Sequence, residues 1–473
     1  MNKNVLFKNT VILIICSLFI KILALTNRIV LTRLLGEEGI GLYIIVLPSI
    51  MLFLSLGSFS LNTGVTQMVA KNNDYGIIKK AIKIAIIAST IISILVFLFI
   101  RVLTYTLLRQ PNAFYPLLLS IPLIYLSAFN SIYRGYYNGL KKVNISSLSI
   151  LIEQISRILI SILLLIKFKD QGIEKAVSIS IIAMSFGEIF SILYVLLKIK
   201  KTPPTNYYKT KDIIDVCFPI TASRLFGNIT FFLEPIIFTF ALGLLKVNNT
   251  DIVLKYGEVN AYAIPLITMF LFIPMAISQA VVPDVASQSP EKLKNLISST
   301  LFFSILPAIP ITIILILYSP EFMQLIYGTK IGANLSTKYS LFFIFLYIQP
   351  SLISIMQATN RNKKLLIISC INDVIKLILI FTLPLFLNEG LILSFVISTI
   401  FLNTVIFMYL KKIYKFSLGR IRIINLCLIT IILSLFSIIL QIGNINYIIS
   451  SILLIVSFIL LLIYLKIISF HNK

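Results

Sequence analysis

The sequence is poor in charge, and most of the charge that it has is of one sign. Only 12% of its 473 residues are charged, with 41 Lys and Arg against 17 Asp and Glu, while 58% are hydrophobic. Mean hydropathy is +1.01. A soluble globule of this length needs more polar surface, so the composition excludes a soluble domain.

Residues that enzyme sites need are equally scarce. The only histidine is His471, and the sequence has no GxxxxGK[ST], GxGxxG or HExxH motif. Four cysteines, Cys16, Cys217, Cys370 and Cys427, occur singly in apolar runs, without metal-ligand spacing. The net charge of +24 is spread over short loops rather than gathered in a patch, which argues against nucleic acid as a partner. We expect a non-enzyme with no catalytic residue, metal or cofactor.

Long apolar runs are what the sequence has in abundance. A run of about 20 residues crosses a bilayer as a helix, and runs of this kind fill nearly the whole chain. They predict an all-α polytopic membrane protein with about fourteen transmembrane helices. The expected spans are 11–35, 41–70, 81–108, 114–139, 143–168, 173–198, 212–245, 254–283, 293–318, 336–359, 365–387, 390–410, 423–442 and 445–469.

The N-terminus imitates a secretory signal, because Lys3 and Lys8 precede an apolar run. The run continues to about Leu35, which is too long for a signal, and it shows no small-residue cleavage site. It is therefore expected to be the first membrane helix.

Charge also predicts how the spans are grouped and oriented. A basic segment with Pro203-Pro204 follows the sixth span, so we expect an N-terminal lobe at 1–199, a cytoplasmic linker at 200–211, a C-terminal lobe at 212–416 and two further helices at 417–473. Lys and Arg gather in alternate loops, as they do on the cytoplasmic side. This pattern predicts a multi-pass protein of the cell membrane with both termini in the cytoplasm.

The two sets of six spans look like a weak internal repeat. Lys21 and Arg224 occupy the middle of the first span in each set, and the second spans end in similar runs, 64–70 and 281–287. Six spans per unit predict parallel repeats, as in transporters whose halves rock about a central site.

Several motifs in residues 10–290 resemble those of the stage V sporulation protein B family, within the multidrug/oligosaccharidyl-lipid/polysaccharide exporter superfamily. These motifs are Asn27-Arg28-Ile29-Val30, the segment 33–43, Tyr133 to Gly139, Glu153-Gln154 with Arg157, Ser223 to Asn228, Phe232 to Pro235, and Lys255 to Glu258. The resemblance implies two six-helix lobes with two extra helices. It also implies a role in spore-cortex peptidoglycan synthesis as a flippase of lipid-linked precursors, related to lipid II flippases of the MurJ type.

Charged residues within the spans are the candidate site, because charge is costly in lipid and marks functional paths. Lys21 and Arg28 share one face of a helix and could hold one anion, unless one of them reaches the interface or pairs with an acid. Arg224 and Asn228 also share a face and suit a diphosphate or sugar headgroup. The alternative is a structural bridge from Arg224 to Glu234 or Glu258, two acids that could also couple a cation.

Other candidates carry less weight. Arg134 lies near the cytoplasmic end of span four, where it could receive headgroups, beside Gly135 and Gly139, which allow close helix packing. Glu153 and Arg157 form an i, i+4 pair that is expected to be structural. Prolines at 48, 265, 274 and 283 either bend a gate or are tolerated kinks.

The sequence thus favours a flippase that binds an undecaprenyl-diphosphate-linked glycan in a cationic cavity by alternating access. Its other expected partners are membrane lipids and cell-wall synthesis enzymes. A drug/cation antiporter of the same fold is the alternative transporter, although the first span holds cations where an antiporter needs an acid. A non-transporting membrane scaffold for cortex-synthesis enzymes is the alternative of another class.

Overall fold

The computed structural model describes residues 3–72, 75–168, 171–198, 209–278, 290–465 and 467. Within these ranges all regular structure is helical. Helices satisfy their backbone hydrogen bonds internally, which lipid requires of any lipid-exposed segment. The chain is therefore an all-α polytopic membrane protein, as the sequence predicts.

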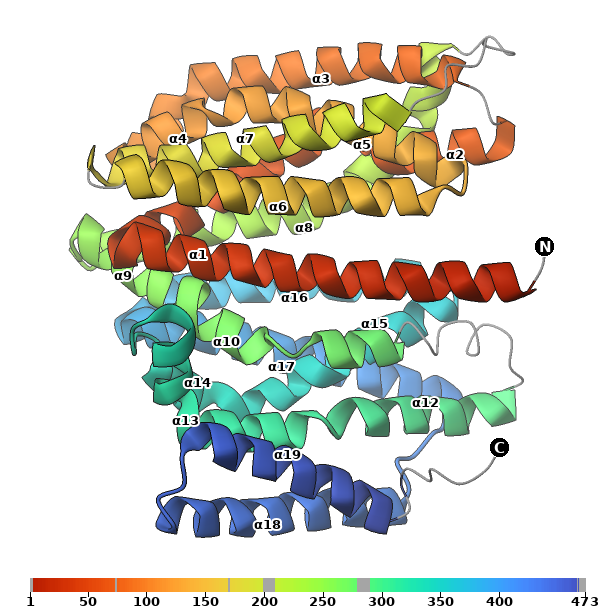
Figure 1. The fold of residues 1–473 in the computed structure, drawn as a ribbon, viewed down its shortest axis with the longest axis vertical. Coiled ribbons are helices and arrows are strands. Elements are labelled where there is room, and N and C mark those ends of the chain that lie inside the picture. Colours follow the sequence, from red (N-terminus) through yellow and green to blue (C-terminus); the bar gives the residue numbers. More distant parts are fainter. Residues whose placement is uncertain are drawn as a thin grey trace. The chain divides into compact units, whose positions relative to one another are not determined.

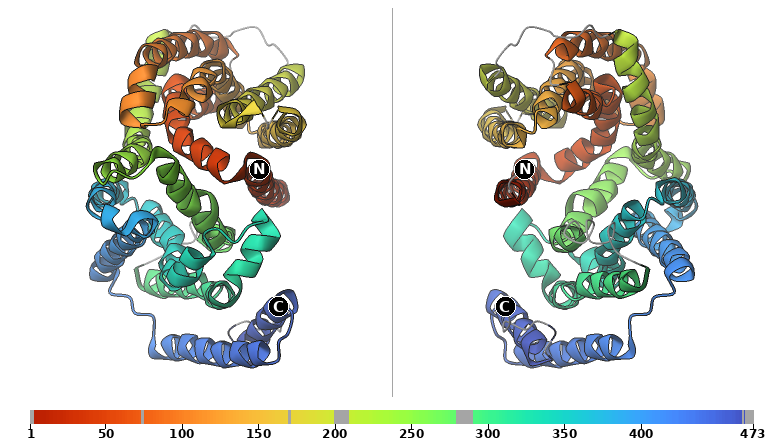
Figure 2. Two further views of the ribbon diagram at one scale, coloured as in Figure 1. Left: turned by 90° about the vertical axis from the view of Figure 1, so that its left-hand side faces the viewer. Right: turned by 90° about the vertical axis from the view of Figure 1, so that its right-hand side faces the viewer.

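Contacts divide the chain into two compact units, Met1–Gly257 and Glu258–Lys473. Within each unit most helices run side by side in Figure 1 and are seen nearly end-on in Figure 2. The first unit consists of α1 (Lys3–Ser58), α2 (Leu61–Asn72), α3 (Gly76–Arg101), the π-helix η1 (Val102–Leu107), η2 (Pro111–Ala113), α4 (Phe114–Leu118), α5 (Ser120–Gly139), α6 (Val143–Phe168), α7 (Ile173–Lys198), α8 (Thr210–Leu244) and α9 (Asn249–Gly257).

The second unit begins with a π-helix and contains the remaining elements. These are η4 (Glu258–Ala263), α10 (Ile264–Thr268), a short helix Phe272–Ser278, α12 (Pro290–Ile305), α13 (Ala308–Tyr327), α14 (Ala333–Tyr339), η5 (Ser340–Phe343), α15 (Ile344–Ala358), α16 (Asn362–Thr382), η6 (Pro384–Phe386), α17 (Leu387–Tyr414), α18 (Arg420–Ile442) and α19 (Tyr447–Tyr464). The C-terminal helices α18 and α19 pack on each other and on α13.

The boundary between the two compact units lies at 257/258, whereas the basic linker was predicted at 200–211. Helix α8, which follows the linker, packs on α1, α2 and α3 and so joins the first unit. Most of the linker lies outside the described residues, as do the repeat segment 281–287, Pro283 and His471. The division into two lobes of six spans remains a prediction.

The described residues contain eleven helices long and apolar enough to cross a membrane, or up to thirteen if two bent pairs each form one span. One of the eleven, Phe19–Lys71, has 53 residues and would measure about 80 Å as a straight helix. That length is more than twice a bilayer core of about 30 Å. Counted as two passes, it brings the total to the fourteen spans that the sequence predicts.

Gly36 makes the turn between these two passes. Its backbone has φ 69° and ψ −177°, which breaks the helical path inside α1. A side chain rarely tolerates positive φ, whereas glycine adopts it readily. The helical path therefore breaks just before Glu37 and Glu38, where the first two spans were predicted to meet.

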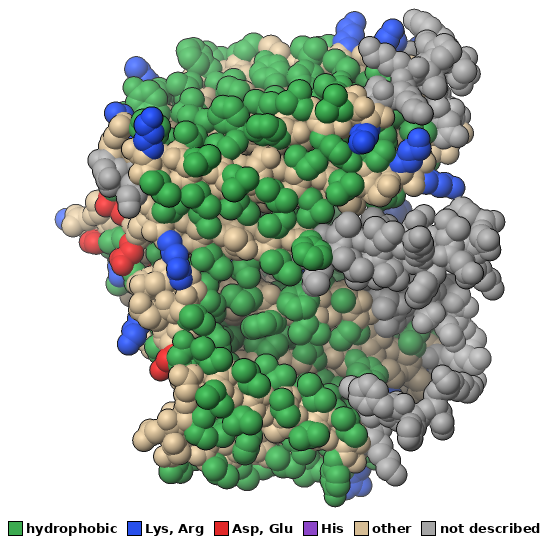
Figure 3. Space-filling model, in the orientation of Figure 1, with side chains coloured by type: hydrophobic (Ala, Val, Ile, Leu, Met, Phe, Trp, Pro, Cys, Tyr) green, Lys and Arg blue, Asp and Glu red, His purple; other side chains and the backbone are tan. Residues whose placement is uncertain are grey.

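Large hydrophobic side chains point outward from the first unit, as a lipid-facing surface requires. Phe97 on α3, Leu163 on α6 and Leu197 on α7 are 65%, 68% and 85% exposed. In Figure 3, hydrophobic side chains cover the middle of the helices of this unit, whereas Lys and Arg lie toward the helix ends. This is the distribution that a hydrocarbon layer between two aqueous interfaces selects.

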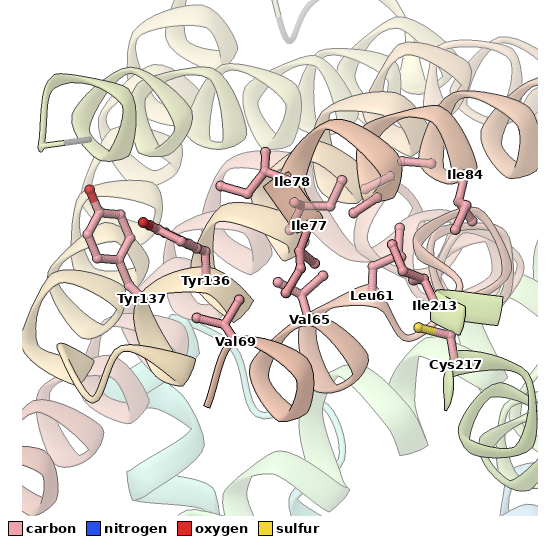
Figure 4. Packing of buried hydrophobic residues seen from close by; sticks show 14 of the residues in the cluster. Leu61, Val65, Val69, Ile77, Ile78, Ile84, Tyr136, Tyr137, Ile213 and Cys217 are labelled. Carbon is pink, nitrogen blue, oxygen red and sulfur yellow. The ribbon is translucent and has the colours of Figure 1, made fainter. Parts of the chain in front are cut away.

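Close helix contacts hold the interior of the first unit together. Figure 4 shows α2 and α3 packed against α5 and α8 through Val65, Ile77, Tyr136 and Cys217. A Cβ atom at Gly135 would lie 2.5 Å from the carbonyl oxygen of Asn62. The predicted close packing at Gly135 is thus confirmed, because α2 and α5 approach too closely for any side chain there.

We expect Gly135→Ala to lower the thermal stability of the protein, because the new methyl group must push α2 away from α5. Overpacking of this kind costs about 1–3 kcal/mol. Gly227→Ala on α8 is the matched control, since its Cβ would meet nothing within 4 Å. The thermal midpoint of the purified protein tests the pair, and equal midpoints for the two variants would contradict the contact.

Candidate substrate-binding site

The second span is broken in its middle, between α1 and α2. Phe59 and Ser60 both have positive φ, 48° and 49°. Such a conformation costs a residue other than glycine roughly 1–2 kcal/mol. The amides of Thr63 and Gly64 each donate to the Ser60 carbonyl at 3.1 Å, which restarts the helix. Helix α1 continues through Pro48, and its one residue with non-helical φ and ψ is Gly36, so the break in the second span does not occur at the proline.

Arg224 and Asn228 of α8 contact the two sides of this break. The Arg224 Nη2 donates to Thr63 Oγ1 at 3.0 Å, and the Asn228 Nδ2 donates to Ser55 Oγ at 2.6 Å. The Arg224 side chain is exposed, and it forms no salt bridge with a carboxylate in the described part of the chain. Within the first unit, the described residues thus show no bridge from Arg224 to Glu234. A bridge to Glu258, which belongs to the second unit, stays a prediction. The Arg224 guanidinium thus keeps N–H groups that make no hydrogen bond to a carboxylate, and it lies beside the Thr63 hydroxyl.

Lys21 and Arg28 lie in the part of α1 that precedes the break at Gly36. Lys21 is exposed and Arg28 is half-buried, while Asn27, which directly precedes Arg28, is buried. Both α1 and α8 belong to the first unit. That Lys21, Arg28 and Arg224 face one substrate cavity remains a prediction.

The two candidate acids differ in their surroundings. Glu234 on α8 is buried, with 4% of its surface exposed, and its Oε1 accepts a hydrogen bond from the Tyr256 hydroxyl at 3.3 Å. Glu258 is half-buried and begins the π-helix η4 in the second unit. Their role in coupling a cation stays a prediction.

Arg134 belongs to a buried ion-pair cluster. Its Nη2 lies 2.7 Å from Glu153 Oε2, and its Nε and Nη2 donate to Ser149 and Ser191 at 3.0 and 2.9 Å. Arg157 Nη2 holds the other Glu153 oxygen at 2.5 Å, which gives the expected i, i+4 pair. One carboxylate thus joins two cations and links α5 with α6. This geometry favours a structural role for Arg134. Its contact with headgroups stays a prediction.

A second buried acid completes this cluster, and the sequence interpretation missed it. Glu188 on α7 is 7% exposed, and its Oε2 accepts a hydrogen bond from Asn130 Nδ2 at 2.5 Å. Asn130 also donates to Ser191, which joins Glu188 to Arg134 through one more hydrogen bond. The cluster therefore contains two Arg and two Glu. The sequence did contain a signal for this residue, because Glu188 is an acid in the middle of the predicted sixth span, where charge is costly.

The eighth span is bent as well. Its two parts, Asn249–Thr268 and Phe272–Ser278, meet at 55° between Pro265 and Pro274. At the bend, within the second unit, lies an apolar cavity of about 540 Å³ lined by residues of α10, the bend itself, α13 and α19, including Leu266, Phe270 and Ile314. The second and eighth spans, which the repeat pairs with each other, are thus both broken.

Comparisons with known proteins agree with this architecture. A family model described as polysaccharide biosynthesis protein matches residues 6–285. Stage V sporulation protein B of Bacillus subtilis (strain 168) is 30% identical over 81% of this chain and 78% of its own length. A second relative, sporulation protein YkvU of the same organism, is 23% identical over 60% of this chain and 66% of its own. The predicted resemblance to the stage V sporulation protein B family is confirmed.

Solved structures of related fold include transporters of two kinds. The lipid II flippase MurJ in an inward closed conformation matches with a TM-score of 0.75 and 16% identity, covering 96% of this chain and 99% of that one. An inward-facing multidrug resistance MATE family transporter of the MOP superfamily matches with a TM-score of 0.63 and 15% identity, covering 84% and 94%. At these identities the likeness establishes the fold.

Proposed function

The chain belongs to the polysaccharide biosynthesis protein family, and from this premise we propose that it is a flippase for an undecaprenyl-diphosphate-linked glycan. The cargo is a lipid II-type peptidoglycan precursor, exposed alternately to the two sides of the cell membrane. The proposed setting is spore-cortex synthesis, together with cell-wall synthesis enzymes. Both termini are proposed to lie in the cytoplasm.

One observation carries the proposal, namely the exposed guanidinium of Arg224 in the middle of a membrane span. A cation without a carboxylate partner is costly at this depth unless it serves an anionic ligand or a water-filled path. A guanidinium donates two parallel hydrogen bonds to one phosphate. Asn228 lies one turn along the same face of α8 and supplies amide groups suited to a sugar or to a second phosphate.

The break in the second span supports alternating access. Arg224 and Asn228 contact residues on opposite sides of the break, Thr63 and Ser55. A headgroup that takes the place of the Thr63 and Ser55 hydroxyl groups would free the parts of the second span on both sides of the break from α8. The broken span is thus the proposed hinge, in the kind of position where small backbone changes open a path.

The apolar cavity in the second unit suits the polyprenyl part of the cargo. It is lined almost wholly by aliphatic and aromatic side chains of α10, α13 and α19. An isoprenoid chain gains free energy in such surroundings only by shape and dispersion contacts, since lipid is equally apolar. Such contacts discriminate little between lipid chains, so we assign the selectivity to the cations.

The membrane potential is the proposed driving force. A diphosphate carries negative charge, and an inside-negative potential favours its outward movement by about 2.3 kcal/mol per charge per 100 mV. No nucleotide-binding motif is then needed.

Binding of the two cargo classes separates the proposal from its alternatives. We expect the purified chain to bind lipid II and not the organic cation tetraphenylphosphonium, because the exposed charges at the candidate site are cations. Thermal stabilisation by each compound, titrated in detergent, measures this. Binding of the cation alone would indicate the antiporter, and binding of neither would indicate the scaffold.

A further inference from the structure

A polar cavity lies at the end of the third span, remote in sequence from Arg224. It measures about 730 Å³, is open to the surface, and is lined by the end of α3, the π-helix η1, the segment η2 to α4 and the start of α7. Its polar lining consists of Arg101, Tyr105, Asn112, Tyr115 and Glu174, with Thr106 beside them. All of these residues belong to the first unit.

The charges in this cavity are opposite but separate. Arg101 and Glu174 are its two charged lining residues, and the described structure records no salt bridge between them. One Glu174 oxygen accepts the backbone amide of Tyr115 at 3.5 Å, which leaves the other oxygen available. The cavity thus offers a cation and an anion at separate places and has no net charge.

An apolar groove adjoins the polar cavity. It has a volume of about 380 Å³ and is lined by Phe53, Leu95, Val96, Phe99, Val102 and Phe232. Val102 lines both spaces. It is the first residue of the π-helix, a local widening of the helix that is frequent at functional sites. The third span therefore lines both an apolar groove and a polar cavity, which share Val102.

We propose that this pair of spaces binds a bilayer phospholipid with a zwitterionic phosphoethanolamine head, with the head in the polar cavity and an acyl chain in the groove. The guanidinium of Arg101 binds the phosphate. The free oxygen of Glu174 accepts from the ammonium, and the hydroxyl groups of Tyr105 and Tyr115 donate to ester or phosphate oxygens. The head has no net charge, which matches the cavity.

The same charge balance argues against other lipids. A diphosphate-linked glycan brings at least two negative charges to a cavity with one cation and one anion. Phosphatidylglycerol brings one negative charge and has no ammonium group that could donate a charge-assisted hydrogen bond to Glu174. Phosphatidylcholine has a cation without N–H groups, so it lacks the donor that a carboxylate needs.

Native mass spectrometry of the full-length chain tests the site. The protein is mixed with equal amounts of phosphatidylethanolamine, phosphatidylcholine and phosphatidylglycerol of identical acyl chains. We expect phosphatidylethanolamine to be retained about tenfold over phosphatidylcholine, the change in affinity that one charge-assisted hydrogen bond brings. Glu174→Gln should remove this preference, and Arg101→Gln should weaken binding of all three lipids.

The controls separate the site from general annular lipid. Lys175→Gln changes an exposed charge next to Glu174 but outside the cavity lining, so the preference should persist. Leu95→Trp should fill the groove and reduce retention of every lipid while the thermal midpoint holds. A Glu174→Gln protein that keeps the preference, or a wild-type protein that prefers phosphatidylglycerol or binds all three equally, would overturn the proposal. These residues are distinct from Arg224 and its neighbours, so either result leaves the proposed flippase function standing.

Discussion

Replacing Arg224 by Ala is expected to abolish spore-cortex formation in a sporulating host that depends on this chain. Each hydrogen bond to a charged group contributes about 1.5–3 kcal/mol, so loss of the guanidinium should weaken headgroup binding about 10- to 100-fold or more. The variant should still reach the membrane at normal abundance, because Arg224 has no carboxylate partner to orphan in the described structure. Cortex formation and membrane abundance are measured together.

Two further variants show whether the effect is specific to this side chain. Arg224→Lys should recover only part of the activity, because an ammonium keeps the charge but loses the two parallel hydrogen bonds. Lys211→Ala removes an exposed cation from the first turn of the same helix and should leave activity unchanged. Full activity of the Lys21→Ala, Arg224→Ala double variant at normal abundance would reject headgroup binding by these residues and favour the scaffold.

Replacing Glu153 by Ala is expected to cause the largest loss of stability. Glu153 is the shared partner of Arg134 and Arg157, so its removal leaves two half-buried guanidinium groups without their carboxylate, and Glu188 remains as the other acid of the cluster. Breaking a buried pair costs about 3–5 kcal/mol. We expect a large fall in the thermal midpoint and in membrane abundance, whereas Arg157→Ala should cost less because Arg134 still neutralises Glu153.

A matched control and a rescue variant make this result interpretable. Asp251→Asn removes an exposed acid of the same unit and should leave the midpoint unchanged. Replacing Arg134, Glu153 and Arg157 by Met, Leu and Met, together with Glu188→Gln so that no buried carboxylate loses its cations, should restore much of the lost stability, since uncharged side chains of similar volume often replace buried ion pairs without loss. A Glu153→Ala protein as stable as wild type would show that the cluster does not hold α5 and α6 together.

The helices and their number were predictable because apolar run length maps directly onto bilayer thickness. The break at Gly36 was predictable in the same way, since the apolar runs stop at the acidic residues that follow it. The close contact at Gly135 followed from glycine spacing alone. In each case a local property of the sequence determines the structure.

Features that depend on packing were harder to predict. The break at Phe59 and Ser60 has only a weak signal, namely a glycine and two serines within 57–60, and the prediction pointed to the proline at 48 instead. The partners of Arg134 come from α6 and α7, so no spacing within one helix indicates them. Placement of α8 in the first unit depends on contacts of α1 to α3, which a repeat of six spans does not reveal.

Lipid II flipping by the purified chain tests the central claim most directly. The wild-type protein and the Arg224→Ala variant are reconstituted at equal density in vesicles that carry fluorescent lipid II, with and without an inside-negative potential. The account predicts protein-dependent flipping that the potential accelerates in the outward direction and that the Arg224→Ala variant has lost. Flipping by the wild-type protein at the rate of protein-free vesicles, in either condition, would contradict it.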